Sequence, residues 1–126
     1  LIEHLRAGSA DIRARSRLSL ADFYVTNNVT QYVSYRIAHI QSAGGVPNYE
    51  ASVNKIMRSE LGQRVYNFGT KMLSLHGQLL PEQAGAPFEG FFPENYMTSV
   101  PSTIAAGSNE IQRNIIATRG LDLPRT

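Results

Sequence analysis

The sequence predicts an all-α domain, an up-and-down bundle of about four helices. Two long segments carry apolar residues at every third or fourth position, and clusters of glycine and proline separate the segments. No segment alternates with the period of two that a half-buried β-strand requires. Because 126 residues are enough for one hydrophobic core, we expect a single bundle over residues 1–126.

The first long helix is expected from about Ala10 to Gln41. Ser9 is a candidate N-cap, and a glycine pair at 44 and 45 followed by Pro47 ends the segment. Its periodic apolar residues predict one buried stripe. The stripe comprises Leu18, Ala21, Val25, Val29, Tyr32, Val33, Ile37 and Ile40. Ahead of this helix, Leu1, Ile2 and Leu5 resemble the end of another helix, stopped by Gly8, so we expect the chain to be part of a longer protein.

The second helix, from about Tyr49 to Leu75, has the clearest periodicity of the chain. A turn of a few residues separates it from the first helix, so the two should pack antiparallel. The apolar positions that step by three or four along it are Val53, Ile56, Met57, Leu61, Val65, Phe68, Met72 and Leu75.

The rest of the chain is expected to contain a loop and two shorter helices. After Gly77 the helical pattern dissolves into a loop of about fifteen residues with several prolines. A short helix from about Glu94 to Thr103 follows, disturbed by Pro101. The last helix opens at Ser108 and runs to about Arg119. Three aromatic residues in the loop, Phe88, Phe91 and Phe92, either line an apolar tunnel or cover the end of the bundle.

Composition excludes several classes of function. Without cysteine, disulfides, thiol catalysis and thiolate metal sites are impossible, and no apolar run approaches the length of a membrane span. His4, His39 and His76 are far apart and lack the spacing of metal ligands. The sequence therefore gives no indication of a metal site.

The charge distribution argues against a nucleic-acid partner. The sequence pI is near 9.2, but the formal net charge is only +2. Residues 1–17 carry four arginines against two acidic residues, and the other residues have equal numbers of basic and acidic side chains. The excess therefore lies in one arginine cluster, which has no nucleic-acid recognition motif and no interleaved aromatic residues.

Two carboxylates that are candidate catalytic bases, Glu60 and Glu50, have positions that a structural role explains. Glu60 and Arg64 stand four residues apart, a spacing that stabilises a helix face. Glu50 falls in the first turn of its helix, where its charge complements the helix dipole.

The start of the last helix is the most informative site candidate. Small residues, Ala105 to Gly107, precede Ser108 as N-cap, and the N–H groups that follow would be free to face an anion. Such a helix end suits a phosphate or pyrophosphate, although a plain capped helix has the same sequence features.

This segment also resembles a known family. Thr103-Ile-Ala-Ala-Gly-Ser-Asn-Glu-Ile-Gln-Arg-Asn-Ile-Ile-Ala117 and Gly120-Leu-Asp-Leu-Pro-Arg125 are similar to the C-terminal signature of acyl-CoA dehydrogenases. In addition, Ala51-Ser-Val-Asn-Lys-Ile-Met-Arg-Ser-Glu60 resembles a family segment of the form Ala-x-x-x-Lys-x-x-x-Ser-Glu. The resemblance covers nearly the whole chain, which would correspond to the C-terminal helical domain of the family.

The resemblance implies an FAD-dependent enzyme that introduces a double bond between Cα and Cβ of an acyl-CoA thioester. A carboxylate base removes the α-proton, and the flavin takes the β-hydrogen as hydride. The implied partners are the acyl-CoA substrate, an electron-transfer flavoprotein and further subunits of a homo- or heterotetramer. The implied location is the bacterial cytoplasm or, alternatively, the mitochondrial matrix. A free-standing helical assembly module that binds no flavin is the alternative function.

The resemblance also assigns candidate FAD contacts. Gly107, Ser108 and Glu110 match the glycine, hydroxyl residue and Glu/Gln of the signature. In many members a Gln-x-x-Gly-Gly motif contacts the FAD of a neighbouring subunit, and of that motif only Gly77 is present here. The Arg-x-x-Phe-Gly motif that normally precedes this region is absent from the sequence.

One departure concerns catalysis. Many members carry the catalytic glutamate directly before the glycine of the signature, and this chain has Ala106 there. Because alanine cannot accept a proton, either the base comes from a preceding helix, or the subunit is non-catalytic beside an active partner, as in bacterial heterotetrameric members. We expect this chain alone to have no dehydrogenase activity.

Overall fold

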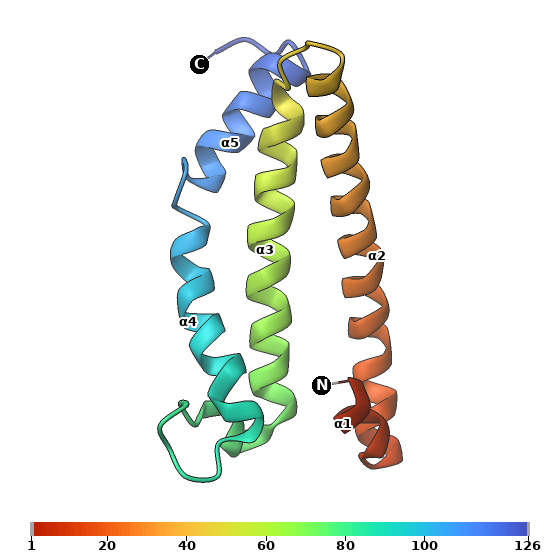
Figure 1. The fold of residues 1–126 in the computed structure, drawn as a ribbon, viewed down its shortest axis with the longest axis vertical. Helices are drawn as coiled ribbons and strands as arrows, with labels where there is room; N and C mark the ends of the chain where they lie inside the picture. Colours follow the sequence, from red (N-terminus) through yellow and green to blue (C-terminus); the bar gives the residue numbers. More distant parts are fainter. Residues whose placement is uncertain (1, 126) are drawn as a thin grey trace.

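The computed structural model describes residues 2–125 and confirms the all-α fold (Figure 1). The α-helices are α1 (Ile2–Ala7), α2 (Ala10–Ser42), α3 (Tyr49–Met72), α4 (Phe91–Ser102) and α5 (Asn109–Ile115). Two 3₁₀ turns, η1 (Ser74–Gln78) and η2 (Pro87–Gly90), connect α3 to α4, and a π-helical turn, η3 (Ile116–Gly120), extends α5. The expectation for Leu1 lies outside the described residues.

Helix α3 lies in the middle of one layer of helices. Among the described residues it contacts α2 on one side and α4 and α5 on the other, whereas α2 touches neither α4 nor α5. Helices α2 and α3 are antiparallel, as predicted, and α4 and α5 run back along α3 toward the turn that joins α2 to α3 (Figure 1). The C-terminal elements therefore meet the first half of α3.

The ends of α2 follow local sequence rules. The hydroxyl of Ser9 accepts the N–H of Ile12 at 3.3 Å, which confirms Ser9 as the N-cap. At the other end Gly44 adopts φ +78°, a left-handed conformation that glycine reaches without steric cost.

The predicted buried stripe of α2 is wrong over most of its length. Leu18 is 80% exposed and Tyr32 is 71% exposed, whereas the buried residues of α2 are Ser16 and Thr30. Helix α2 instead packs on α3 through another face, on which the ring of Phe23 stacks edge-on against Phe68. Periodicity identifies an apolar face but does not say which neighbour covers it.

Much apolar surface of this layer is uncovered. The buried apolar side chains are few among the described residues: Leu5, Leu61, Leu73 and Phe92. The accessible surface is 8625 Å², whereas a compact monomer of this mass exposes about 6,700 Å². The difference, about 2,000 Å², is similar to the surface that a stable protein interface buries. This surface is typical of a domain that packs against further protein.

The short helix differs from its predicted bounds. Helix α4 begins at Phe91 rather than Glu94 and ends at Ser102, with Pro101 in its last turn. Pro93 is compatible with this start, because the first N–H groups of a helix have no intrahelical acceptor. Helix α3 ends at Met72 rather than at Leu75, and Leu75 is 83% exposed.

The aromatic loop packs onto the end of the bundle. Phe92 is buried against Gly69, and its ring makes edge-to-face contacts with Phe88 and Phe91, with centroids 5.6 and 5.3 Å apart. Phe88 also contacts His4 of α1 in the same way. This packing favours the covering role over the tunnel.

No helix within residues 2–125 has both the length and the apolar character that crossing a membrane requires.

Candidate functional site

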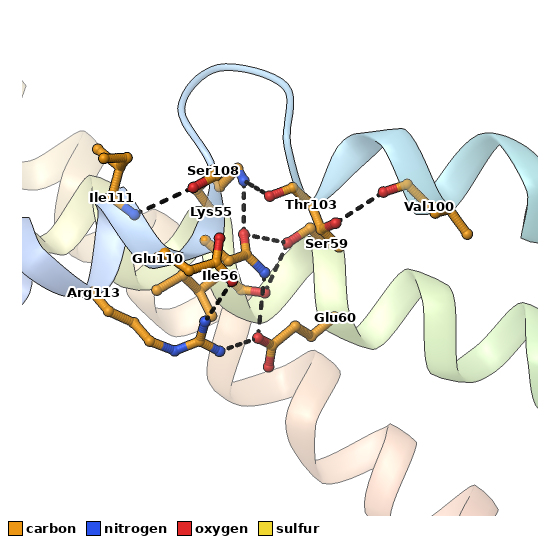
Figure 2. Close-up of polar contacts among 11 residues, drawn as sticks. Lys55, Ile56, Ser59, Glu60, Val100, Thr103, Ser108, Glu110, Ile111 and Arg113 are labelled. Atoms are coloured by element: carbon orange, nitrogen blue, oxygen red, sulfur yellow. Dashed lines mark hydrogen bonds and ion pairs between the residues drawn. The ribbon is translucent and has the colours of Figure 1, made fainter.

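The centre of the candidate site is Asn109, the first residue of α5. Its side chain is buried, with 4% exposure, and its Oδ1 accepts from Lys55 Nζ at 2.7 Å and from Ser59 Oγ at 3.2 Å. Its Nδ2 donates to Glu60 Oε1 at 3.3 Å. Figure 2 shows these α3 side chains directed at the start of α5. One asparagine thus joins both segments that carried the family resemblance.

The same contacts hold the loop between α4 and α5. Lys55 Nζ also donates to the carbonyl of Thr103 at 3.1 Å, and the N–H of Asn109 donates to that carbonyl at 2.9 Å (Figure 2). The Gln112 side chain donates to the carbonyl of Ala106 at 3.0 Å. The loop is therefore tied to α3 at one end and to α5 at the other.

Two consecutive residues of this loop have left-handed backbone conformations. Ala106 has φ +55° and Gly107 has φ +86°. A Cβ at Gly107 would lie 2.8 Å from Gln112 Nε2, so a side chain there would displace the contact that holds Ala106. Ala106 itself is exposed, and its methyl group offers no proton acceptor.

Ser108 caps α5 as predicted, but fewer N–H groups are free than the sequence suggested. Its hydroxyl accepts the N–H of Ile111 at 3.4 Å, and Thr103 accepts that of Asn109. Within residues 2–125, the N–H groups of Gly107 and Ser108 donate to no protein acceptor. The loop therefore presents the N–H groups of Gly107 and Ser108 as backbone donors directly ahead of the helix.

Glu110 is exposed and ionised beside these donors. Hydrogen bonds from its own N–H and from Ser108 lower the pKa of its carboxyl group below the ordinary value, and the nearby charges of Arg113 and Lys55 act in the same direction. The carboxylate brings a negative charge to the helix N-terminus. A ligand group that donates hydrogen bonds suits this position better than a second anion.

Glu60 does not pair with Arg64 as the spacing predicted. Its Oε1 binds Arg113 of α5 and Asn109, whereas Arg64 pairs with Asp22 of α2. The reason is that both side chains reach charged partners on neighbouring helices. Glu60 thus fastens α5 to α3.

Glu50 occupies the first turn of α3, as expected, and has additional partners. It is 8% exposed, its Oε2 accepts the N–H of Asn48 at 3.2 Å, and its Oε1 accepts from Arg36 of α2 at 3.3 Å. Its own N–H, the Asn48 N–H and Arg36 lower the pKa of its carboxyl group, against the opposing effect of burial. Glu50 therefore joins the turn to both long helices.

This lowered pKa predicts an acid-dependent loss of stability. Glu50 should contribute fully above its ordinary pKa of 4.5, and the contribution should disappear as pH falls through the lowered value. A Glu50→Gln variant should unfold at a lower temperature than the wild type at pH 7, and the difference should narrow below pH 4.5. Thermal unfolding measured across this pH range tests the prediction, and a constant difference would contradict it.

Gly77 lies apart from the Asn109 cluster. It is buried in η1, where a Cβ would lie 2.1 Å from the carbonyl oxygen of Thr70. From Ser59 to Thr70 the axis of α3 rises about 16 Å. The structure therefore does not bring Gly77 together with Ser108 and Glu110, and packing alone requires glycine there.

A shallow groove begins at Ala106 and runs between α3 and α4. Its volume is about 500 Å³. Small and hydroxyl-bearing side chains line most of it, including Ser59, Gly62, Ser99 and Ser102. At the loop end the groove is lined by Ala105 and Ala106.

Comparison with known protein families gives a match over most of the chain. The family model described as "Acyl-CoA dehydrogenase, C-terminal domain" matches residues 13–121. The chain belongs to the acyl-CoA dehydrogenase family. The match includes both the Lys55–Glu60 segment and the start of α5, so the residues that meet at Asn109 all lie within this acyl-CoA dehydrogenase domain.

Individual relatives cover a similar part of the domain. The chain is 28% identical to the acyl-CoA dehydrogenase FadE26 of Mycobacterium tuberculosis over 112 residues, which are 86% of this chain and 28% of the relative. The solved ChsE4-ChsE5 complex from Mycobacterium tuberculosis matches with a TM-score of 0.79 and 28% identity, over 87% of this chain and 28% of that chain. A variant of the Tcur3481-Tcur3483 steroid ACAD matches with a TM-score of 0.79 and 25% identity, over 87% and 29% of the two chains. The chain spans less than a third of the length of these relatives.

Sequence reasoning missed Asn109 as a site residue. Its neighbours Ser108 and Glu110 match FAD contacts that the family resemblance implies, whereas an asparagine in a first helical turn is common. The only signal was the segment that carries Lys55, Ser59 and Glu60, because Lys55 and Ser59 lie one turn apart on α3 and Glu60 follows directly.

Proposed function

We propose that the chain is the C-terminal bundle of an FAD-dependent acyl-CoA dehydrogenase and that the loop from 103 to 110 forms one side of its FAD site. The observation that carries the proposal is the convergence of Lys55, Ser59 and Glu60 on Asn109. These contacts fix the backbone just ahead of α5, where the unused N–H groups of Gly107 and Ser108 lie.

The residues present fit part of the cofactor. The two free N–H groups can donate to flavin or ribityl oxygens, and the Glu110 carboxylate and Ser108 hydroxyl can accept from hydroxyl or N–H groups. The ionised Glu110 disfavours the pyrophosphate at the same spot. When bound, FAD supplies the acceptor for the β-hydrogen of the acyl chain.

Gly77 belongs to a second contact in this proposal. Its position beside Thr70, away from the Asn109 cluster, fits a contact to the FAD of a neighbouring subunit, as the resemblance implies. Its close approach to Thr70 makes Gly77 a poor test residue, because a substitution would disturb α3 whether or not FAD is bound.

Ala106 implies that this loop does not supply the base. We propose that the proton acceptor comes either from a preceding helix of the full polypeptide or from a partner subunit. A heteromeric assembly is supported by two solved neighbours whose names join two components. The full assembly would act on an acyl-CoA, with a steroid side chain as one candidate substrate, and pass electrons to an electron-transfer flavoprotein.

The alternative is a helical assembly subunit that binds no flavin. The large uncovered surface and the absence of a carboxylate at position 106 favour this alternative as a second candidate. The purified full polypeptide decides between them: the first function predicts a yellow protein with flavin absorbance. A colourless protein that added FAD does not stabilise would support the alternative.

Alanine variants of the two serine N-caps distinguish the loss of a flavin contact from the loss of helix stability. Ser9 and Ser108 cap their helices with nearly the same backbone angles, φ −61° and ψ 161° against φ −60° and ψ 158°. Each change to alanine should cost about 1 kcal/mol of stability. Only Ser108→Ala should also weaken FAD retention, measured by flavin absorbance after gel filtration of the full assembly. Equal retention in both variants would exclude the Ser108 contact.

Ala106→Glu tests whether the loop has kept the geometry of a catalytic position. A correctly placed general base contributes at least about a hundredfold to rate. Because Ala106 already has a left-handed backbone, glutamate adds no new backbone strain. In a subunit without another base, the variant should raise exchange of the acyl-CoA α-proton with deuterated water by at least about tenfold. Wild-type exchange in a variant that still retains FAD would contradict the proposed geometry.

A further inference from the structure

The peptide group between Ala106 and Gly107 is held by a side chain of α5. Gln112 donates from its Nε2 to the carbonyl of Ala106 at 3.0 Å. The backbone N–H of Gln112 donates to the carbonyl of Ser108 at 2.9 Å, so the residue that holds the loop is itself fixed by the helix. The contact therefore joins an exposed loop residue to a half-buried helical residue six positions later.

Burial does not require this contact. Ala106 is exposed, and water can hydrogen-bond an exposed carbonyl group. The backbone of Ala106 is nevertheless left-handed, with φ +55°, a conformation that is unfavourable for a residue with a Cβ. Unfavourable backbone conformations persist where surrounding contacts determine them, and they are concentrated at ligand sites. The Gln112 contact therefore sets the orientation of this peptide group and does not merely satisfy a buried atom.

The same contact fixes the direction of the Gly107 N–H. The Ala106 carbonyl and the Gly107 N–H belong to one planar trans peptide group, so they point in opposite directions. Because Gln112 holds the carbonyl, the N–H is directed away from Gln112. Among the described residues this N–H donates to no protein acceptor. Gln112 thus orients a hydrogen-bond donor that this part of the chain does not use itself.

Gly107 leaves the space through which the Gln112 side chain reaches Ala106. A Cβ at position 107 would lie 2.8 Å from Gln112 Nε2. The left-handed backbone of Gly107, with φ +86°, is also one that glycine adopts without steric cost. Positions 107 and 112 therefore act as a pair, because the glycine admits the side chain that holds the preceding carbonyl.

We propose that Gln112 is a positioning residue of the FAD site, which directs the Gly107 N–H toward an oxygen atom of the bound FAD. The inference rests on the proposed function, since it requires FAD to lie beside the loop from 103 to 110. Gln112 acts through the Ala106 carbonyl, so it is not a catalytic residue. Its role differs from that of Asn109, whose contacts tie the ends of the loop to α3 but leave the peptide group after Ala106 unbound.

The first test makes the same substitution at two positions of α5. Gln112→Met removes the donor and keeps the length of the side chain, and Asn114→Met is the control at an exposed position. FAD is removed from the full assembly, and its Kd is then measured by fluorescence titration. Gln112→Met should weaken FAD binding at least about tenfold, as expected for the loss of one well-oriented hydrogen bond. Asn114→Met should change the Kd less than about twofold. Equal Kd values for the two variants would overturn the proposal.

A pH profile distinguishes hydrogen bonding from packing. Gln112→Glu keeps the shape of the side chain, but near neutral pH its carboxylate cannot donate to the Ala106 carbonyl. As pH falls toward the ordinary glutamate pKa of about 4.3, the protonated carboxyl group regains a donor. The factor by which Gln112→Glu weakens FAD binding should therefore shrink at least about threefold between about pH 7.5 and about pH 4.5. For Asn114→Glu, which adds the same charge to α5, the factor should stay constant. A constant factor for Gln112→Glu would contradict the proposal.

A double-mutant cycle tests whether positions 107 and 112 act through one contact. Gly107→Ala should displace the Gln112 side chain, because the new methyl group would lie 2.8 Å from its Nε2. Adding Gln112→Met to Gly107→Ala should then weaken FAD binding less than about twofold further. If the losses of the two single variants multiply instead, the two residues do not share a contact and the proposal is wrong. A wild-type assembly that binds no FAD contradicts the proposed function, whereas unchanged FAD binding by Gln112→Met, in an assembly whose wild type binds FAD, contradicts only the role of Gln112.

Discussion

The free energy of unfolding of a Gly69→Ala variant should be about 2–3 kcal/mol lower than that of the wild type. A Cβ at this position would lie 2.0 Å from Cδ1 of Phe92, far inside van der Waals contact. The Phe92 ring has little room to move, because it is buried and its edges meet Phe88 and Phe91. The aromatic loop or the C-terminal half of α3 must therefore shift. Urea unfolding of the full polypeptide, followed by circular dichroism, measures the loss.

Gly62→Ala provides the matched control on the same helix. A Cβ at Gly62 would meet only Tyr66, at 3.7 Å, which is an ordinary contact. Because alanine has the higher helix propensity, this variant should be more stable than the wild type by about 0.5–1 kcal/mol. Opposite signs at the two glycines support the packing of Phe92 on Gly69, and equal effects would contradict it.

The free energy of unfolding of an Asn109→Ala variant should be about 2–3 kcal/mol lower than that of the wild type. The change removes one buried side chain that hydrogen-bonds three other side chains. Lys55 and Ser59 would lose a shared acceptor, and Glu60 would lose a donor. Lys55 would keep the Thr103 carbonyl, so the ammonium group would not be left without a partner. The loss should appear as a lower denaturant midpoint and faster hydrogen exchange in α5 and in the loop before it.

Asn114 supplies the control for Asn109. It lies on the same helix but is exposed, so Asn114→Ala should change stability by less than about 0.5 kcal/mol. If both asparagine variants lose the same stability, the effect comes from α5 in general rather than from the buried cluster. If neither does, the cluster does not hold the loop.

Local features of the fold could be predicted from the sequence because local rules decide them. Ser9 and Ser108 were expected as N-caps and act as N-caps, and the antiparallel pair of long helices follows from one short turn. The start of α4 was misplaced by three residues, because Pro93 is tolerated in a first helical turn. In these cases the interactions that determine the structure join residues only a few positions apart in the chain.

Tertiary features could not be predicted in the same way. The face of α2 that contacts α3 is less apolar than the face that stays uncovered, so a hydrophobicity pattern selects the wrong one. The partners of Glu60 lie 49 and 53 residues away, beyond any helical spacing rule. The left-handed backbone at Ala106 has no compositional signal either, because alanine rarely adopts it.

The most direct test of the proposed FAD site is an experimental structure of the full assembly with its flavin. We expect FAD to lie within hydrogen-bonding distance of the Gly107 or Ser108 N–H, or of the Glu110 carboxylate, with the Lys55, Ser59 and Glu60 contacts to Asn109 intact. A structure in which this loop faces bulk solvent, remote from every flavin of the assembly, would contradict the account.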